Sequence, residues 1–424
     1  MTRYLRERTL FGPLIKVEPS SDLGLCVVIP ARDESESLLQ SLASLRACDS
    51  TTGSAEVIVV VNTSETDSSE IVARNAESAA LARDWAAEDG NGRLRFHILE
   101  AHGLPRKHAG VGLARKIGMD EACRRLERVG RPDGVIACFD ADSRCDPNYL
   151  AEIESLFRID EAAQACSIHF EHPLEGDEFS SEIYHAITDY ELHLRTYVNA
   201  QRFAGFPFAT QTIGSSMAVR CVAYQAQNGM NRRQAGEDFY FLHKFTPLGN
   251  VRELNTTRVI PSPRASHRVP FGTGRAVGER INEGGPCLTY APASFLDLGE
   301  FFGRLDDGFE SKFDHLPDSI GAFLETQAFS ERLSEIRANV TNAEAFRVRF
   351  FRWFNAFLVM KYLHFARDRY HPDVEVTEAA RWLLEQRGEP APLSARELLL
   401  RWREIDRTRS AAAPPVADLC RRGR

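Results

Sequence analysis

Apolar runs and amphipathic stretches alternate along the first 170 residues of the chain. Five short runs rich in Val, Ile, Leu, Phe, Ala and Cys are typical of buried strands. They are residues 25–29, 56–61, 94–99, 135–139 and 165–170. Helical periodicity separates them, at residues 35–46, 68–87, 109–128 and 147–157. This alternation predicts right-handed β-α-β crossovers, and therefore an α/β fold with a mostly parallel, Rossmann-like sheet covered by helices on both faces.

The pattern changes in the second half of the chain. A polar and aromatic stretch is predicted to be helical around residues 181–200, and one further strand is expected at residues 214–219. Residues 294–386 are helical in rhythm. A helix over residues 345–367 would place four rings on one stripe, because spacings of three and four residues share a helix face. These rings are Phe346, Phe350, Phe354 and Phe357.

The most apolar stretch of the chain is residues 350–365, which contain Arg352, Lys361 and His364. A bilayer core of about 30 Å needs a longer and less charged helix. We therefore expect no transmembrane segment, and a buried amphipathic helix rather than a helix on the membrane surface, which would share the aromatic content. Its aromatic face is expected to pack on the α/β domain rather than on lipid.

Composition narrows the class of protein. The 424 residues suffice for two or three domains, and 43% hydrophobic with 26% charged residues is ordinary for a soluble protein. A net charge of -8 disfavours nucleic acid as the main partner. The nine cysteines contain no CxxC pair, which fits neither a zinc ribbon nor a disulfide framework. The first 20 residues lack the apolar segment of a signal peptide. We expect a cytoplasmic protein in a reducing compartment, or one peripheral at the inner face of the membrane.

An acidic triplet follows the fourth apolar run. Asp140 and Asp142, separated by Ala141, leave the C-terminal end of the strand predicted at residues 135–139. Open α/β sheets bind ligands at this edge, and carboxylates suit Mg²⁺ or Mn²⁺ carrying a substrate phosphate. The alternative is a solvated turn, where Asp is common. The order of the surrounding segments favours the metal site.

Five segments resemble, in order, those of glycosyltransferase family 2 on the nucleotide-sugar-binding fold called GT-A. The first follows the first strand, and Asp33 there replaces the usual Asn. The resemblance implies that this segment binds the nucleotide sugar through Pro30, Ala31, Arg32 and Glu34. In the second segment, residues 60–67, Asn62 replaces the acidic residue that reads the base, and an amide can still bond a base edge.

The third segment, residues 109–115, resembles the family's glycine-containing helix start. Gly110 would let the backbone approach a diphosphate, and Arg115 could add positive charge. The alternative is a helix start with small residues for packing. The fourth segment is the triplet, called the Asp-Ala-Asp motif below. The resemblance implies that Asp142 binds the metal, that Asp140 contacts the ribose or the metal's waters, and that the motif, with Ala141, borders the nucleotide sugar.

The fifth segment lies on the acceptor side and ends with Gly236, Glu237 and Asp238. The resemblance implies that Asp238 is the general base of an inverting enzyme, with Glu237 as the fallback. A helix start would favour ionised carboxylates there. Alternatively, the pair is a solvated helix start. In the following loop, the resemblance to retaining relatives offers His267 as a further metal ligand, or it is a surface histidine. Arg264 and two further arginines could cover the diphosphate, or form a solvated basic loop. These two are Arg268 and Arg275.

The resulting hypothesis is an inverting, Mg²⁺- or Mn²⁺-assisted glycosyltransferase of the hexosyltransferase type. It would move a sugar from a nucleotide-diphosphate donor, UDP or GDP, to an acceptor hydroxyl of a small molecule, glycan or lipid-linked compound. Two alternatives remain: a retaining GT-A enzyme with a glycerate-type acceptor, and a non-catalytic nucleotide-binding protein. We expect an N-terminal extension, a GT-A domain, a helical C-terminal region and a disordered tail. Their expected bounds are residues 1–22, 23–280, 290–408 and 409–424.

Overall fold

The computed structural model describes the chain except for short segments. Those not described are residues 36, 89–91, 267–271, 306–308, 310–312 and 410–424. The chain forms two compact units. Unit 1 comprises Met1–Ser180, Thr212–Gly278 and the described residues 406–409, and unit 2 comprises Ser181–Gln211 and Glu279–Ile405.

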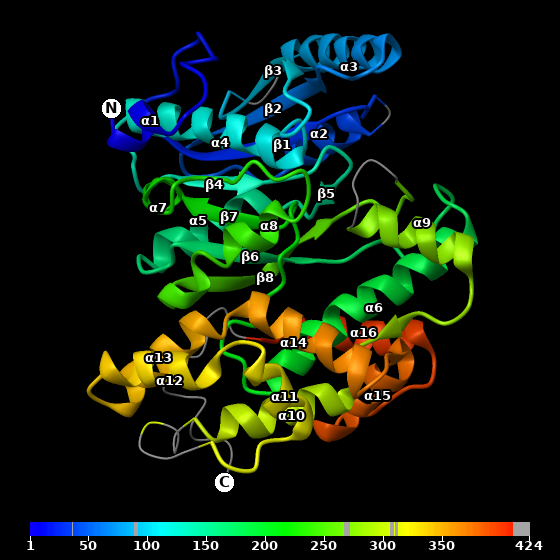
Figure 1. Ribbon diagram of the computed structural model, residues 1–424. Coiled ribbons are helices and arrows are strands. Elements are labelled where there is room, and N and C mark those ends of the chain that lie inside the picture. The colour runs from blue at the N-terminus through cyan, green and yellow to red at the C-terminus, as the bar shows by residue number, and fades with distance from the viewer. Residues whose placement is uncertain (36, 89–91, 267–271, 306–308, 310–312, 410–424) are drawn as a thin grey trace. The chain divides into compact units, whose positions relative to one another are not determined.

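Unit 1 is built on a sheet of eight strands in the order β3-β2-β1-β4-β7-β6-β8-β5 (Figure 1). The strands are β1 Leu23–Ala31, β2 Ser54–Ser64, β3 Leu94–Leu104, β4 Val135–Cys138, β5 Arg144–Cys145, β6 Ala165–Phe170, β7 Met217–Arg220 and β8 Val251–Ile260. The pairs β3-β2, β2-β1, β1-β4 and β6-β8 are parallel, and β7 and β5 pair antiparallel to their neighbours. The predicted α/β class and mostly parallel sheet are confirmed.

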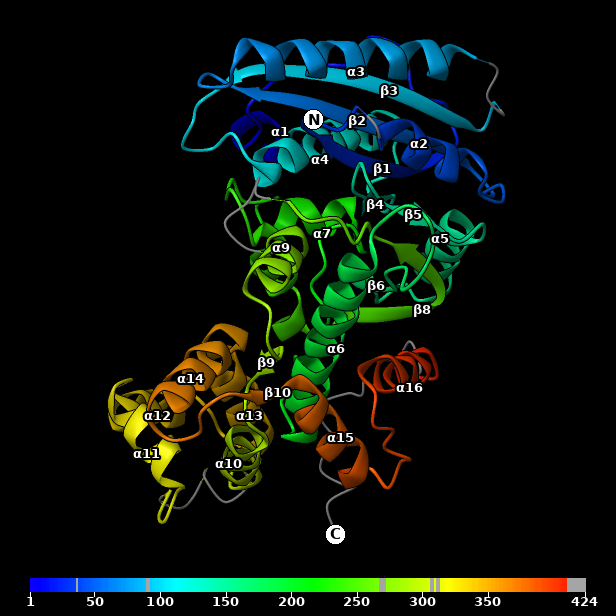
Figure 2. The same ribbon diagram turned by 90° about the vertical axis from the view of Figure 1, so that its right-hand side faces the viewer.

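Helices cover this sheet on both faces. They are α1 Arg3–Glu7, α2 Leu38–Arg46, α3 Ser69–Ala87, α4 Val111–Arg128, α5 Tyr149–Ile159, α7 Cys221–Ala226 and α8 Glu237–Leu242, with the 3-10 turn η1 Thr246–Leu248. The connections through α2 and α3 run outward from β1 to β3, and α4 returns to β4 on the other side of β1. Right-handed crossovers in opposite directions place α4 on the opposite face from α3, as Figure 2 shows. The strand order reverses between β1 and β4, which is where such sheets bind ligands.

Helix α4 packs between the sheet and the N-terminal extension of unit 1. Gly118 lies against the sheet so closely that an added Cβ would come within 2.4 Å of Val28 Cγ1. The N-terminal extension packs on the outer side of this helix: Tyr4 donates a hydrogen bond of 2.7 Å to Asp120 Oδ1, and Glu121 accepts two backbone N–H bonds from the extension. Residues on both sides of α4 therefore fix its position.

Unit 2 contains α6 Ser181–Phe203 and most of the helices after residue 280. The latter are α10 Pro292–Gly303, α11 Asp318–Glu325, α12 Phe329–Ala338, α13 Ala343–Trp353, α14 Ala356–Arg369 and α15 Val376–Gln386, with a small antiparallel pair β9 Leu288–Thr289 and β10 Val374–Glu375. The boundaries between the units fall within α9 Thr273–Glu283 and α16 Ala395–Arg407. Phenylalanines form much of the core of unit 2. The ring centroids of Phe301 and Phe350, for example, lie 5.6 Å apart, and both side chains are fully buried.

The prediction of one helix over residues 345–367 is wrong. The helix is interrupted between α13 and α14 because Asn355 caps α14. The side-chain oxygen of Asn355 accepts the N–H groups of Phe357 and Leu358 at 3.0 and 3.2 Å. Phe346, Phe350 and Phe354 are fully buried, whereas Phe357 is only partly buried. The ring contacts described for the three buried residues are to other rings of unit 2, such as Phe301, and not to the α/β domain as predicted. No helix in the described part of the chain is long and apolar enough to cross a membrane.

Two further features differ from the expectations. The helix predicted at residues 181–200 exists as α6, but it belongs to the helical unit rather than to the α/β domain predicted to extend to residue 280. Arg409 was placed in the tail, yet its guanidinium pairs with Glu253 at 3.2 Å within unit 1. Residues 410–424 lie outside the described chain.

Two ion pairs on α4 predict a contrast in stability. Arg125 Nη2 binds Glu56 Oε1 at 2.6 Å with both side chains buried, whereas Arg128 and Glu18 form an exposed pair. Removing one partner of a buried pair leaves an uncompensated charge, so Glu56→Gln should lower the free energy of unfolding by about 3 kcal/mol at pH 7. The matched exposed change, Glu18→Gln, should cost less than about 1 kcal/mol. Urea unfolding measures both.

The pH dependence of this effect follows from the carboxyl of Glu56. Burial alone would raise its pKa, but the hydrogen bonds from Arg125, with His97 3.6 Å away, outweigh burial and lower the pKa to about 2. A depressed pKa gives stability that is present above the ordinary value of about 4.3 and is lost as pH falls toward the folded value. The difference between wild type and Glu56→Gln should therefore shrink from pH 5 to pH 2. A constant difference would contradict this assignment.

Candidate functional site

The C-terminal ends of β1 and β2 meet beside the switch between β1 and β4. Pro30 and Ala31 end β1 in register with β2, and Asn62 follows on β2. Asn75 of α3 joins the two ends: its Oδ1 accepts the N–H of Asp33 at 2.8 Å, and its Nδ2 donates to the backbone oxygen of Asn62 at 3.2 Å. Asn75 was not among the predicted residues, because it is a single polar residue on an otherwise ordinary amphipathic helix; in the structure it is buried.

The side chain of Asn62 lies at this edge with an unused donor. Asn62 is 2% exposed, and its Nδ2 makes no hydrogen bond to any residue that the structure describes. A buried amide donor without an acceptor costs free energy, so it calls for a partner. A carbonyl oxygen on a ligand could provide one.

Charged pairs hold the loop that leaves β1. Asp33 adopts a left-handed backbone with φ of 59°, a conformation that Asn and Asp tolerate better than other non-glycine residues. Arg74 binds the Asp33 carboxylate at 2.6 Å, and Arg32 binds Asp67 at 2.5 Å. Burial would raise the pKa of Asp67, but the bonds from Arg32 and the amide of Ser64 outweigh it and lower that pKa. The predicted donor residue Arg32 thus fixes the loop.

Arg264, on the chain after β8, connects two of the predicted donor-site residues. Its Nε lies 2.8 Å from Asp142 Oδ2, and its Nη2 lies 2.5 Å from Glu34 Oε1. Glu34 is buried, and the side chain of Asp142 keeps 20% exposure. One guanidinium therefore holds the end of β1 against the Asp-Ala-Asp motif.

Arg115 joins the other half of that motif to the acidic pair on α8. Its guanidinium binds Asp140 and Glu237, and Arg115 is 2% exposed. Gly214 makes room for it, because a Cβ at that position would lie 2.6 Å from both terminal nitrogens of Arg115. Arg115 was expected to add positive charge near a diphosphate; in the structure it lies between two carboxylates.

Asp238 differs from its neighbour Glu237. Glu237 is buried and paired with Arg115. Asp238 is partly exposed, and its Oδ1 accepts the backbone N–H of Phe239 at 2.7 Å. Burial raises the pKa of Asp238 above its ordinary value, although the charge of Arg115 opposes the rise. A helix start would lower the pKa of Asp238, so the shift has the opposite direction to the one expected. The reason is that α8 is short and the desolvation of the carboxylate is stronger than the effect of the helix.

The glycines before and within α4 face protein rather than open space. A Cβ on Gly110 would lie 2.7 Å from Gln234 Cα, and one on Gly112 would lie 2.4 Å from the backbone oxygen of Arg233. The segment that precedes α8 therefore crosses the start of α4. This contact matches the packing alternative for these glycines and fixes the acidic pair near the start of α4.

The carboxylates of the motif fit a hard divalent cation. Mg²⁺ is commonly held by one or two carboxylates together with substrate phosphates. Asp140 and Asp142 keep 35% and 20% side-chain exposure. No group of three or more His, Cys, Asp or Glu residues that could hold a metal occurs among the described residues. His267, the predicted third ligand, lies outside the described residues.

Residues 26–214 match the sequence model of the family described as Glycosyl transferase family 2. The predicted resemblance is confirmed over this segment, and with the eight-stranded sheet and the helices after it, the chain has the predicted GT-A-type fold with a C-terminal helical region. The match includes the Asp-Ala-Asp motif and ends before Glu237, Asp238 and Arg264. A search of curated proteins found no match.

Solved structures of S. aureus TarS resemble the chain. TarS 1–349 in complex with UDP-GlcNAc is 12% identical, with a TM-score of 0.41, over 87% of this chain and 93% of that chain. TarS 1–349 in complex with UDP is 13% identical, with a TM-score of 0.40, over 78% of this chain and 89% of that chain. At these values the likeness carries no assignment of ligand or residue.

The close contact at Gly214 gives a test of this arrangement. Gly214→Ala should displace the guanidinium of Arg115 and lower the free energy of unfolding by about 1–3 kcal/mol, as overpacking does. Gly321 is the matched control, because it lies inside α11 and a Cβ there meets nothing within 4 Å. Gly321→Ala should raise stability by up to about 1 kcal/mol, because Ala favours a helix. Equal effects of the two substitutions in urea unfolding would refute the contact.

Proposed function

With residues 26–214 matched to glycosyl transferase family 2, we propose that the chain transfers a sugar from a UDP or GDP sugar to an acceptor hydroxyl with inversion. One observation carries this proposal: Arg115 binds both Asp140 and Glu237. This buried guanidinium brings the carboxylates suited to a metal-bound diphosphate next to the acidic pair that could activate an acceptor.

The donor would bind along the C-terminal ends of β1, β2 and β4. The free amide donor of Asn62 suits a carbonyl oxygen of uracil or guanine, whereas an acidic residue at that position could only accept. Pro30 and Ala31 would border the base, because they end the adjacent strand in register with β2. Asp140 would face the ribose or the diphosphate.

Asp142, with Asp140, would hold Mg²⁺ or Mn²⁺ carrying the diphosphate. The ion would neutralise the leaving nucleoside diphosphate as a Lewis acid. In the structure Arg264 already pairs with Asp142 and Glu34. Before the donor binds, Arg264 would be the cation that keeps these two carboxylates together.

Asp238 is the better candidate for general base. Glu237 is buried and tied to Arg115, so its carboxylate serves to hold α8 in place. Asp238 is partly exposed, and burial raises its pKa toward the range where a carboxylate accepts a proton more readily. One base acting on the acceptor from the far side of the sugar gives inversion, by the geometry known from inverting hydrolases.

Substitution of Asp142 tests the metal assignment. Asp142→Ala should abolish the part of UDP or GDP affinity that depends on Mn²⁺, because the carboxylate is the direct ligand in this proposal. Calorimetry with Mn²⁺ and with EDTA separates that part from the rest. Asp133→Ala is the control, because Asp133 is an exposed aspartate in the turn before β4. Mn²⁺-dependent affinity equal in both variants would remove Asp142 from the metal site.

Substitution of Asp238 tests the mechanism. Asp238→Asn should leave donor binding nearly intact and slow transfer, measured as Mn²⁺-dependent hydrolysis of a UDP or GDP sugar, by about 10²-fold or more, because Asn keeps the shape but accepts no proton. Glu237→Gln should instead lower the free energy of unfolding by about 3 kcal/mol, because it leaves Arg115 with one buried partner fewer.

Near-normal turnover of Asp238→Asn would remove that residue from catalysis. Proton NMR of the released sugar then decides the stereochemistry. Retention at the anomeric carbon would favour the retaining alternative, in which Asp238 orients the substrate. If several nucleotide sugars bind and none is turned over, the chain is a nucleotide-binding protein without catalysis.

A further inference from the structure

Helices α12 and α13 of unit 2, with the residue that caps α14, line an open hollow of about 470 Å³. It lies within the range of small-ligand cavities. We call it the basic pocket. The residues that line it are Arg332, Glu335, Ile336, Arg349, Arg352, Trp353 and Asn355.

The charges around the basic pocket do not balance. Arg332 is paired with Glu335 at 2.5 Å. Arg349 and Arg352 make no hydrogen bond or ion pair with any residue of the described chain, and both are exposed. Three guanidiniums against one carboxylate leave two unmatched positive charges around one hollow. Like charges held together are unfavourable until an anion neutralises them.

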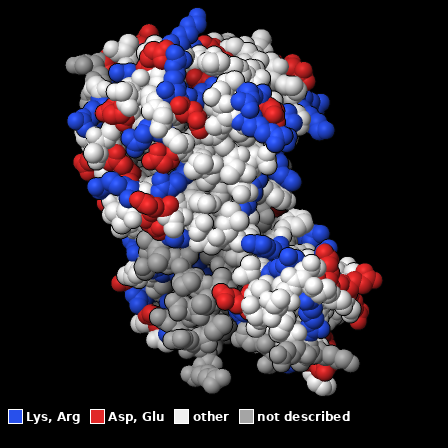
Figure 3. Space-filling model, turned by 90° about the vertical axis from the view of Figure 1, so that its left-hand side faces the viewer, with Lys and Arg blue, Asp and Glu red and all other residues white. Residues whose placement is uncertain are grey.

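The net charge of the protein is -8. Several of its other arginines are matched with acids. Arg258, for example, binds both Asp146 and Glu171 at 2.9 Å. The face shown in Figure 3 carries acidic and basic side chains side by side. Two unmatched arginines on one helix, facing one hollow, therefore indicate a ligand rather than the general charge of the surface.

A rigid aromatic wall lies beside these charges. The ring of Trp353 stacks on Phe329 with centroids 5.7 Å apart and an interplanar angle of 17°, and it contacts the edge of Phe350 at 5.6 Å. Trp353 remains partly exposed. Its position is thus fixed by packing, and it offers an apolar surface to whatever the arginines bind.

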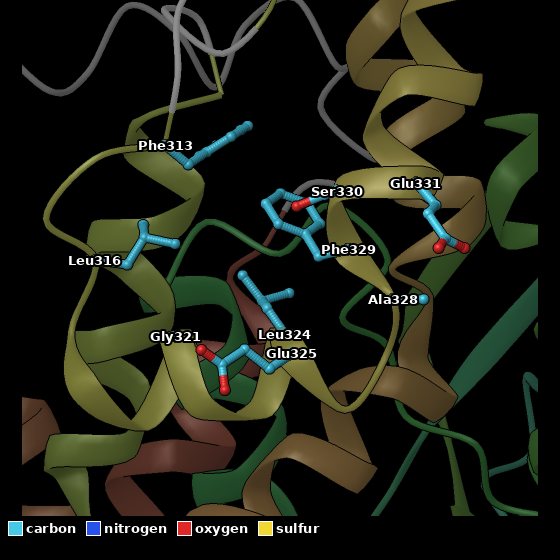
Figure 4. A pocket seen from close by; sticks show the side chains of 9 residues that line it. All are labelled: Phe313, Leu316, Gly321, Leu324, Glu325, Ala328, Phe329, Ser330 and Glu331. Carbon is cyan, nitrogen blue, oxygen red and sulfur yellow. The ribbon is translucent and has the colours of Figure 1, made fainter.

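A second hollow in the same unit shows that basic residues do not line every such space. It measures about 300 Å³, and Figure 4 shows side chains from the chain around α11 and the start of α12. Its described lining contains two glutamates and no Lys or Arg. The residues are Phe313, Leu316, Gly321, Leu324, Glu325, Ala328, Phe329, Ser330 and Glu331.

We propose that the basic pocket binds a phosphate-bearing molecule through Arg349 and Arg352, with Trp353 against the part that adjoins the phosphate. A phosphate monoester carries about two negative charges at pH 7, which match the two unmatched arginines. Guanidinium forks bind phosphate oxygens in pairs. This site is separate in its residues from the donor site and does not depend on glycosyl transfer.

Calorimetry of the full chain tests the proposal with inorganic pyrophosphate and with glycerol 3-phosphate. EDTA in a phosphate-free buffer silences metal-dependent binding of the donor. The double variant Arg349→Gln/Arg352→Gln should weaken the affinity by about tenfold or more, because bonds between charged groups are among the strong ones. Arg369→Gln is the matched control, an exposed arginine of the same unit that lies over Phe365 and lines no part of the pocket. It should bind as the wild type does, and so should Asp142→Ala.

Flotation with phosphatidic acid vesicles identifies the source of the phosphate. Binding to vesicles that the double variant loses would name a lipid headgroup, and binding of the soluble phosphates alone would name a free metabolite. The proposal is overturned if neither class of probe binds, if the double variant binds them as the wild type does, or if Arg369→Gln weakens binding equally. Equal thermal unfolding of the variants without phosphate ensures that a lost fold is not mistaken for a lost site.

Discussion

A single buried cation, the guanidinium of Arg115, determines the geometry of the candidate site. Removing it from water is costly unless carboxylates surround it, and Asp140 and Glu237 do so. The pairing holds the turn after β4 against the start of α8. The motif suited to the donor and the acidic pair suited to the acceptor consequently share one cation. Arg264 makes a similar pairing with the second carboxylate of the motif, because it binds both Asp142 and Glu34.

The fold supports this arrangement by fixing α4, which carries Arg115. Gly118 lets the helix approach the sheet, and Gly214 leaves space for the guanidinium. The N-terminal extension packs on the outer side of the same helix through Tyr4. These contacts lie in the buried part of unit 1, so the position of Arg115 is set before any ligand binds. A site that is preorganised in this way needs little rearrangement when charge develops on the donor.

Patterns within one segment predicted most of the fold, and contacts between segments could not be predicted. Strands such as β2 were recognised from β-branched residues, but β8 was missed because polar residues such as Arg252 and Glu253 interrupt its apolar positions. The helix break at Asn355 carried a readable signal, an N-cap residue before an apolar run. The pairing of Arg115 with Glu237 spans 122 positions, and nothing in local spacing indicates it. The sequence therefore names the residues of this cluster one by one, but not the ion pairs that join them.

A crystal structure of the chain with UDP and Mn²⁺ tests the central claim most directly, because the claim concerns which groups face one donor. We expect Mn²⁺ bound by Asp142 and the diphosphate, the base beside Asn62, and Asp238 facing the position where the sugar would begin. A nucleotide bound away from the Asp-Ala-Asp motif, or one that leaves Asp238 on the far side of Arg115 from the sugar position, would contradict it.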